Sequence, residues 1–159
     1  MRLLFLMPLC ILLSFSLTSA AQEINWMSFQ DAIEAQKKDP KKIVMDAYTT
    51  WCGPCKLYDR TTFSDPDIVA FINTHFYAVK FDAEGTETIS YKGKQYNNPR
   101  HIKGRKGRNT THEFARALGV SKYPTLVFFD KQANFLQTLI GYRPPENLIL
   151  YLKYYQPLK

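Results

Sequence analysis

Two cysteines separated by two residues are the part of this sequence best suited to chemistry. Residues 51–56 read Trp-Cys-Gly-Pro-Cys-Lys, so Cys52 and Cys55 form a Cys-x-x-C pair. Such a pair can act as a short disulfide staple, as half of a zinc site, or as a reversible redox couple. The rest of the chain decides between these three uses.

Two of the three uses find little support in the sequence. A disulfide within the motif closes a very short loop, and the stabilisation from loop closure shrinks with loop length. A structural zinc ion needs two further ligands, and the chain has no second Cys-x-x-C. Its histidines also lack the His-x₃₋₅-His spacing; they are His75, His101 and His112. We therefore favour the redox couple and expect no metal and no cofactor.

The elements expected around the motif also favour a redox couple. Residues 42–48 form a mostly apolar run typical of a buried parallel strand, and Pro54 suits the first turn of a helix. Cys52 would then lie at a helix N-terminus, where unpaired N–H groups and the helix dipole favour the nucleophilic thiolate. Cys55, one turn inward, is expected to be more buried and less ionised.

Hydrophobic patterns and capping signals predict the element order α-β-α-β-α-β-β-α. We expect strands at residues 42–48, 76–82, 125–130 and 135–140, with a short edge strand at 24–26. We expect helices at residues 28–38, 66–72, 110–119 and 145–155, and another that begins at 54 and continues past 58. The helix at 110–119 would begin with a capping box formed by Thr110 and Glu113. A helical crossover makes the first two central strands parallel, and a short connection makes the last two an antiparallel hairpin. Residues 83–109 fit no element well, apart from a small hairpin predicted at 91–96.

The N-terminus has the pattern of a secretory signal peptide. Arg2 precedes an apolar run over residues 3–17, and small residues follow at 18–21. We predict a signal peptide at 1–21, a mature domain at 22–159, and a periplasmic or secreted protein. The alternative is an uncleaved anchor, but the run is shorter than the roughly 20 residues of a membrane span. Cleavage would leave a mature form that does not span a membrane, with Cys52 and Cys55 as its only cysteines.

The formal net charge of +7 lies in one stretch of the chain. Residues 88–110 contain no acid and seven basic residues, so the rest of the chain sums to zero; the seven are Lys92, Lys94, Arg100, Lys103, Arg105, Lys106 and Arg108. We call residues 88–110 the basic segment. We expect it to be a solvated loop, with binding of an acidic partner or an anionic membrane surface as the alternative. Nucleic acid is not an expected partner.

Several motifs together resemble the thioredoxin family. Residues 43–46, Ile-Val-Met-Asp, and then 51–56 resemble its active-site segment, and residues 79–82 are similar to its next strand. Residues 119–126 resemble its cis-proline segment. The run 62–66 further resembles secreted thioredoxins related to the C-terminal domain of the periplasmic disulfide reductase. The resemblance covers residues 24–156 and implies an α/β thioredoxin fold, a mixed sheet flanked by helices, with residues 83–109 as a basic insertion after the second central strand.

The resemblance also implies roles for individual residues. Cys52 would be the attacking thiolate and Cys55 the resolving thiol. Asp46 would be the buried acid that helps to deprotonate the resolving cysteine, with Lys80 as its charge partner. The residues implied to contact the substrate are Trp51, Gly53, Pro54, Tyr123 and the cis-proline Pro124.

The sequence departs from the family beside the expected substrate groove. Lys122 and Tyr123 stand where thioredoxin has Gly and Ile, and Ala47, Thr49 and Thr50 replace the usual residues before the motif. Because a charge and a bulky ring change that groove, the substrate range of thioredoxin is not carried over.

We predict a thiol–disulfide oxidoreductase that reduces disulfide-containing proteins. The Gly-Pro dipeptide is that of thioredoxin, whose potential is about −270 mV. An upstream electron donor, such as a membrane thiol reductase, would be needed. The alternatives are an oxidase or isomerase, and a non-enzymatic interaction module that uses the basic segment.

Overall fold

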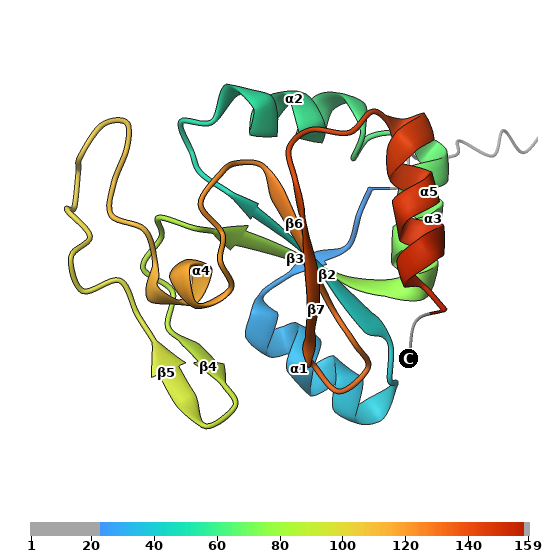
Figure 1. Cartoon of the computed structure of the whole chain (residues 1–159), viewed down its shortest axis with the longest axis horizontal. Helices are drawn as coiled ribbons and strands as arrows, with labels where there is room; N and C mark the ends of the chain where they lie inside the picture. Colours follow the sequence, from blue (N-terminus) through green and yellow to red (C-terminus); the bar gives the residue numbers. More distant parts are fainter. Residues whose placement is uncertain (1–22, 158–159) are drawn as a thin grey trace, which may run out of the picture.

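A five-stranded sheet with helices on both faces forms the body of the molecule (Figure 1). The structure is a computed structural model and describes residues 23–157, so the predicted signal peptide lies outside the described residues. The sheet order is β1-β3-β2-β6-β7. Strands β1, β3 and β2 are parallel to one another, and β6 is antiparallel to both of its neighbours, β2 and β7. The strands are β1 Trp26–Met27, β2 Lys42–Tyr48, β3 Phe76–Asp82, β6 Thr125–Phe129 and β7 Phe135–Ile140.

The five helices in the described part of the chain are divided between the two faces of the sheet. Alternate residues of β2 point to opposite faces, so Ile43 and Met45 pack on one side and Val44 on the other. The first face carries α1 Phe29–Lys38 and α4 Glu113–Ala117, and the second carries α2 Gly53–Thr61, α3 Pro66–His75 and α5 Pro145–Tyr155. Among residues 23–157, no helix is both long and apolar enough to cross a membrane.

Most predicted elements are confirmed, including the parallel pair β2–β3 and the hairpin β6–β7. Ser28 caps α1 as predicted, because its side chain accepts the Asp31 N–H at 3.1 Å. The edge strand begins two residues later than expected and ends one residue later, at Met27. The Trp26 N–H bonds back to the Ile24 carbonyl at 2.9 Å, which bends the chain before pairing with β3 begins.

The predicted capping box before α4 is wrong. The cap is His112, whose Nδ1 accepts the Phe114 N–H at 3.0 Å. The Thr110 hydroxyl instead donates to Asn98 Oδ1, and the Glu113 carboxylate accepts the Asn97 N–H. Because both box residues hold the preceding chain in place, the helix begins at Glu113 rather than at Thr110.

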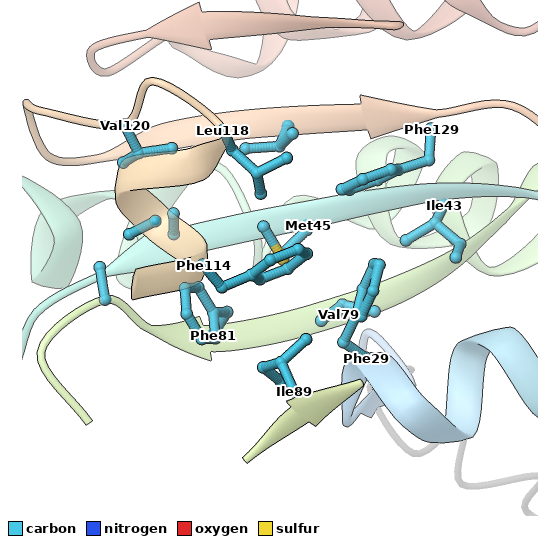
Figure 2. Close-up of a cluster of buried hydrophobic side chains, with 14 of the residues drawn as sticks. Phe29, Ile43, Met45, Val79, Phe81, Ile89, Phe114, Leu118, Val120 and Phe129 are labelled. Carbon is cyan, nitrogen blue, oxygen red and sulfur yellow. The ribbon is translucent and has the colours of Figure 1, made fainter. Parts of the chain in front are cut away.

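The basic segment is only partly a solvated loop. Its first part forms the predicted small hairpin, β4 Ile89–Tyr91 and β5 Lys94–Tyr96, which Figure 1 shows at one end of the sheet. Ile89 is fully buried in the core beside Phe29, Phe81 and Phe114 (Figure 2). The expectation of a loop kept in solution by charge therefore holds only after the hairpin, where residues 99–100 and 102–108 are exposed.

Replacing Ile89 by alanine tests whether the hairpin belongs to the core. We expect the free energy of unfolding to fall by about 2–4 kcal/mol, because the change removes buried methyl groups and leaves a cavity. Ile102→Ala is the matched control, since Ile102 is 51% exposed on the same segment and should change stability by less than about 0.5 kcal/mol. Denaturant titration of the disulfide form measures both. Equal effects would show that the hairpin does not contribute to the core.

Candidate active site

The two cysteines form a disulfide where β2 leads into α2. The Cα atoms of Cys52 and Cys55 are 5.3 Å apart, and both side chains are buried. Cys52 is the N-cap of α2, and its Sγ accepts the Cys55 N–H at 3.2 Å. Gly53 and Pro54 are exposed in the first turn of α2. A backbone N–H directed at Sγ stabilises a thiolate there, as expected for a sulfur at a helix N-terminus.

A cis peptide bond joins Tyr123 to Pro124, as the resemblance implied. Pro124 is buried, and its carbonyl accepts the Gly141 N–H at 2.8 Å. The Thr125 hydroxyl donates to the Lys122 carbonyl at 2.7 Å. These bonds fix the turn that places Lys122 and Tyr123 beside the cysteines.

Asp46 lies in the middle of β2 with no exposed surface. Its Oδ2 accepts a hydrogen bond from Lys80 Nζ at 2.8 Å, whereas Oδ1 has no partner among the described residues. Burial raises the pKa of this carboxyl to about 6, and the opposing effect of Lys80 is too small to restore the ordinary value. An acid with this pKa can take up or release a proton near neutral pH.

Lys80 is shared between two carboxylates. Its Nζ also contacts Asp59 Oδ1, and it lies over the rings of Trp26, Tyr48 and Phe63 at 4.8–5.2 Å from their centroids. Burial alone would lower the pKa of Lys80, but the two carboxylates outweigh it and the pKa is raised. Sequence reasoning missed Asp59. Its position four residues after Cys55, on the same face of α2, was the available signal.

Trp51 is held by a carboxylate that sequence reasoning also missed. Glu84 Oε2 accepts the Trp51 Nε1–H at 2.8 Å and the Asn109 N–H at 2.7 Å. The guanidinium of Arg108 lies 4.8 Å above the Trp51 ring. One buried acid therefore ties the end of the basic segment to the residue before Cys52. No sequence motif marks this pairing, because its partners lie 25 to 33 positions apart.

A groove of about 640 Å³ runs beside the disulfide. Its lining includes both predicted and missed residues, among them Trp51, Cys52, Pro54, Arg108, Lys122 and Tyr123. The ring of Trp51 meets that of Tyr123 edge to face, with 6.1 Å between centroids. Asp46 and Lys80 are not part of this lining. They lie on the sheet face covered by α2, where Asp46 is buried and Lys80 is partly exposed. Of the other predicted residues, Trp51, Cys52, Pro54 and Tyr123 line the groove, whereas Gly53, Cys55 and Pro124 do not. Within residues 23–157, no cluster of three His, Cys, Asp or Glu side chains could hold a metal ion.

A Cys-x-x-Cys disulfide at a helix N-terminus, with the turn before a cis-proline lining the same groove and a buried acid in the strand that leads to it, defines a site for thiol–disulfide exchange. The model of the thioredoxin-like domain family matches residues 29–156, and the chain belongs to that family. It is accordingly a thioredoxin-like thiol–disulfide oxidoreductase with a Cys-x-x-C pair.

Individual relatives are distant. The chain is 25% identical over 143 residues to the thiol:disulfide interchange protein DsbD of Pectobacterium atrosepticum, covering 88% of this chain but only 21% of that protein. The solved structure of DsbH oxidoreductase has a TM-score of 0.63 at 18% identity and is matched over 88% of this chain and 89% of its own. A putative disulphide-isomerase from Bacteroides thetaiotaomicron has a TM-score of 0.60 at 25% identity, over 89% of this chain and 99% of its own.

The raised pKa of Asp46 predicts how stability depends on pH. The unfolded carboxyl titrates near 3.8 and the folded one near 6, so the cost of ionising Asp46 in the fold is absent below about pH 4 and complete above about pH 6. We expect Asp46→Asn to match the wild type near pH 4 and to be more stable by roughly 2–3 kcal/mol at pH 7.

Denaturant titration of both disulfide forms from pH 4 to pH 8 measures this difference. Glu34→Gln is the control, because Glu34 forms an exposed ion pair with Lys37 and should change stability by less than about 1 kcal/mol. A stability difference between Asp46→Asn and the wild type that is constant across this pH range would contradict a buried, ionisable Asp46.

Proposed function

We propose that this protein is exported and reduces disulfides in other proteins through Cys52 and Cys55. The observation that carries the proposal is the position of Cys52 Sγ at the N-terminus of α2, within 3.2 Å of the Cys55 N–H. Export is supported by the charge and apolar pattern of residues 2–21. The proposed location is the periplasm or the extracellular space.

In the first step, the Cys52 thiolate of the reduced protein attacks one sulfur of the substrate disulfide. A Cys52–substrate disulfide forms, and the other substrate sulfur leaves as a thiolate. The substrate would lie in the groove beside Cys52, against Trp51, Tyr123 and Pro124. Gly53 and Pro54 would face it from the exposed first turn of α2.

In the second step, Cys55 attacks Cys52 Sγ. The Cys52–Cys55 disulfide forms, the second substrate thiolate is released, and two electrons have passed to the substrate. Cys55 must first lose its proton. Asp46 is the proposed acceptor, because it is buried on the face covered by α2 and burial brings the pKa of its carboxyl to about 6. Lys80 would position Asp46 and limit that rise in pKa.

The Gly-Pro dipeptide supports net reduction, since thioredoxin carries it and has a potential near −270 mV. An upstream dithiol donor must then return the disulfide to the dithiol. The relatives named thiol:disulfide interchange protein and oxidoreductase agree with thiol exchange in either direction.

Disulfide isomerisation is the second candidate, because the relative from Bacteroides thetaiotaomicron is titled a putative disulphide-isomerase and is matched over 99% of its length. The reduction potential of the Cys52–Cys55 pair separates the two. A value near −270 mV favours a reductase, and a value near −180 mV favours an isomerase.

Reduction of insulin by the dithiol form tests the proposed function. Wild-type protein should reduce insulin with turnover in the presence of dithiothreitol, and Cys52→Ser should not exceed the rate with dithiothreitol alone. Cys55→Ser keeps the attacking sulfur and lacks the resolving one, so it should accumulate a mixed disulfide visible on a non-reducing gel. If Cys52→Ser accumulated the mixed disulfide instead, Cys55 would be the attacking cysteine and Cys52 the resolving one. If the wild type showed no turnover, a non-enzymatic interaction module would be favoured.

Replacing Asp46 by asparagine should slow the second step and spare the first. An amide cannot accept the Cys55 proton, so the lifetime of the mixed disulfide should rise about tenfold or more near neutral pH. Rapid acid quenching followed by mass spectrometry measures this intermediate. Because hydroxide can replace an internal base as the pH rises, the defect should be smaller at alkaline pH than at pH 7. A defect of the same size at pH 7 and pH 9 would argue against proton transfer to Asp46.

A further inference from the structure

We propose that the groove beside Cys52 contains a carboxylate-binding subsite formed by Arg108 and Lys122, and that it selects substrates with an acidic side chain next to the target disulfide. This inference rests on the proposed function and names the substrate class of the same site. It concerns residues from two distant parts of the chain, the end of the basic segment and the turn before Pro124.

Both cations lie at the groove rather than on a remote surface. Arg108, Lys122 and Cys52 line the same cavity of about 640 Å³. Arg108 and Lys122 are both exposed, so a bound chain can reach their charged groups. A carboxylate on a substrate whose disulfide lies at Cys52 would therefore meet positive charge within the groove.

Arg108 is held in position by its neighbours. The Asn109 N–H donates to Glu84 Oε2 at 2.7 Å, and the same oxygen accepts the Trp51 indole N–H at 2.8 Å. The guanidinium carbon of Arg108 lies over the Trp51 ring, 4.8 Å from its centroid. A guanidinium offers paired N–H donors whose geometry matches a carboxylate, so Arg108 can bind one while it lies over the Trp51 ring.

Lys122 is held by a different part of the fold. Its carbonyl accepts the hydroxyl of Thr125 at 2.7 Å, and the cis bond follows directly at Tyr123–Pro124. The backbone of Lys122 is therefore fixed relative to Pro124. Only its side chain has to adjust to a ligand.

The charge on both residues is available to a ligand. Among residues 23–157, no carboxylate forms an ion pair with Lys122 or with any of the seven basic residues of the basic segment. Glu84 also lines the groove, and its charge offsets one of the two cations. It is only 8% exposed and already accepts two N–H groups, so the accessible charge of the groove is positive.

Two disulfide peptides that differ only by a carboxylate in place of an amide test the subsite. Each peptide has one intramolecular disulfide, with Asp or with Asn directly beside one cysteine. The second-order rate of reduction by the dithiol form is measured at low salt and divided by the rate of dithiothreitol with the same peptide. This correction removes differences in the intrinsic reactivity of the two disulfides.

We expect the wild type to favour the Asp peptide about two- to fivefold, the range typical of a partly exposed ion pair. Arg108→Gln and Lys122→Gln should each lower this ratio, and the double variant should bring it close to one. Arg105→Gln removes the same charge from the same segment but does not line the groove, so it should keep the wild-type ratio.

Two results would overturn the subsite while leaving the proposed function intact. One is a wild-type ratio near one, with both peptides reduced. The other is an equal loss of preference in Arg105→Gln and Arg108→Gln, which would assign the preference to the long-range field of the basic segment. Failure to reduce either peptide would instead refute the proposed function, and the subsite with it.

Discussion

The exclusion of Asp46 from water is the constraint on which this site depends. A carboxylate in the middle of β2 is costly to bury, and burial makes its protonated form competitive near neutral pH. The register of β2 against β3 places Lys80 directly beside it. If Lys80 fully offset the effect of burial, the pKa of Asp46 would return to the ordinary value of a carboxyl group. However, the ammonium group of Lys80 also contacts Asp59 and lies over three aromatic rings. The fold therefore tolerates a destabilising group in the place where the proposed chemistry needs a proton acceptor.

Much of this arrangement could be predicted from the sequence, because it depends on local signals. The apolar run of β2, the proline at the start of α2 and the Cys-x-x-C pair all lie within fourteen consecutive residues, 42–55. The cis bond at Pro124 followed from family resemblance rather than from physics, since a peptide bond before proline is usually trans. Asp46 could be identified because an acid inside an apolar strand is conspicuous.

The parts that could not be predicted depend on contacts between distant residues. Glu84 follows a strand and looks like an ordinary surface acid, yet its side chain joins Trp51 to Asn109 and its carbonyl accepts the Asn98 side-chain N–H. The capping box failed for the same reason, because Thr110 bonds to Asn98 instead of to the helix. Charge counting correctly located the excess at 88–110 but could not show that Ile89 is part of the core.

The active site therefore has two electrostatic environments at different depths, and in the proposed mechanism they act on different steps. Asp46, which is buried on the sheet face covered by α2, acts in that mechanism on the proton that Cys55 loses. Arg108 and Lys122 lie on the surface, where water and salt screen their charges, so they act mainly on how a substrate approaches and is held. Glu84 is slightly more exposed than Asp46, and its carboxylate fixes both Trp51 and the backbone next to Arg108. We therefore expect a substitution in the groove to change which disulfide is selected without altering the contact between Asp46 and Lys80.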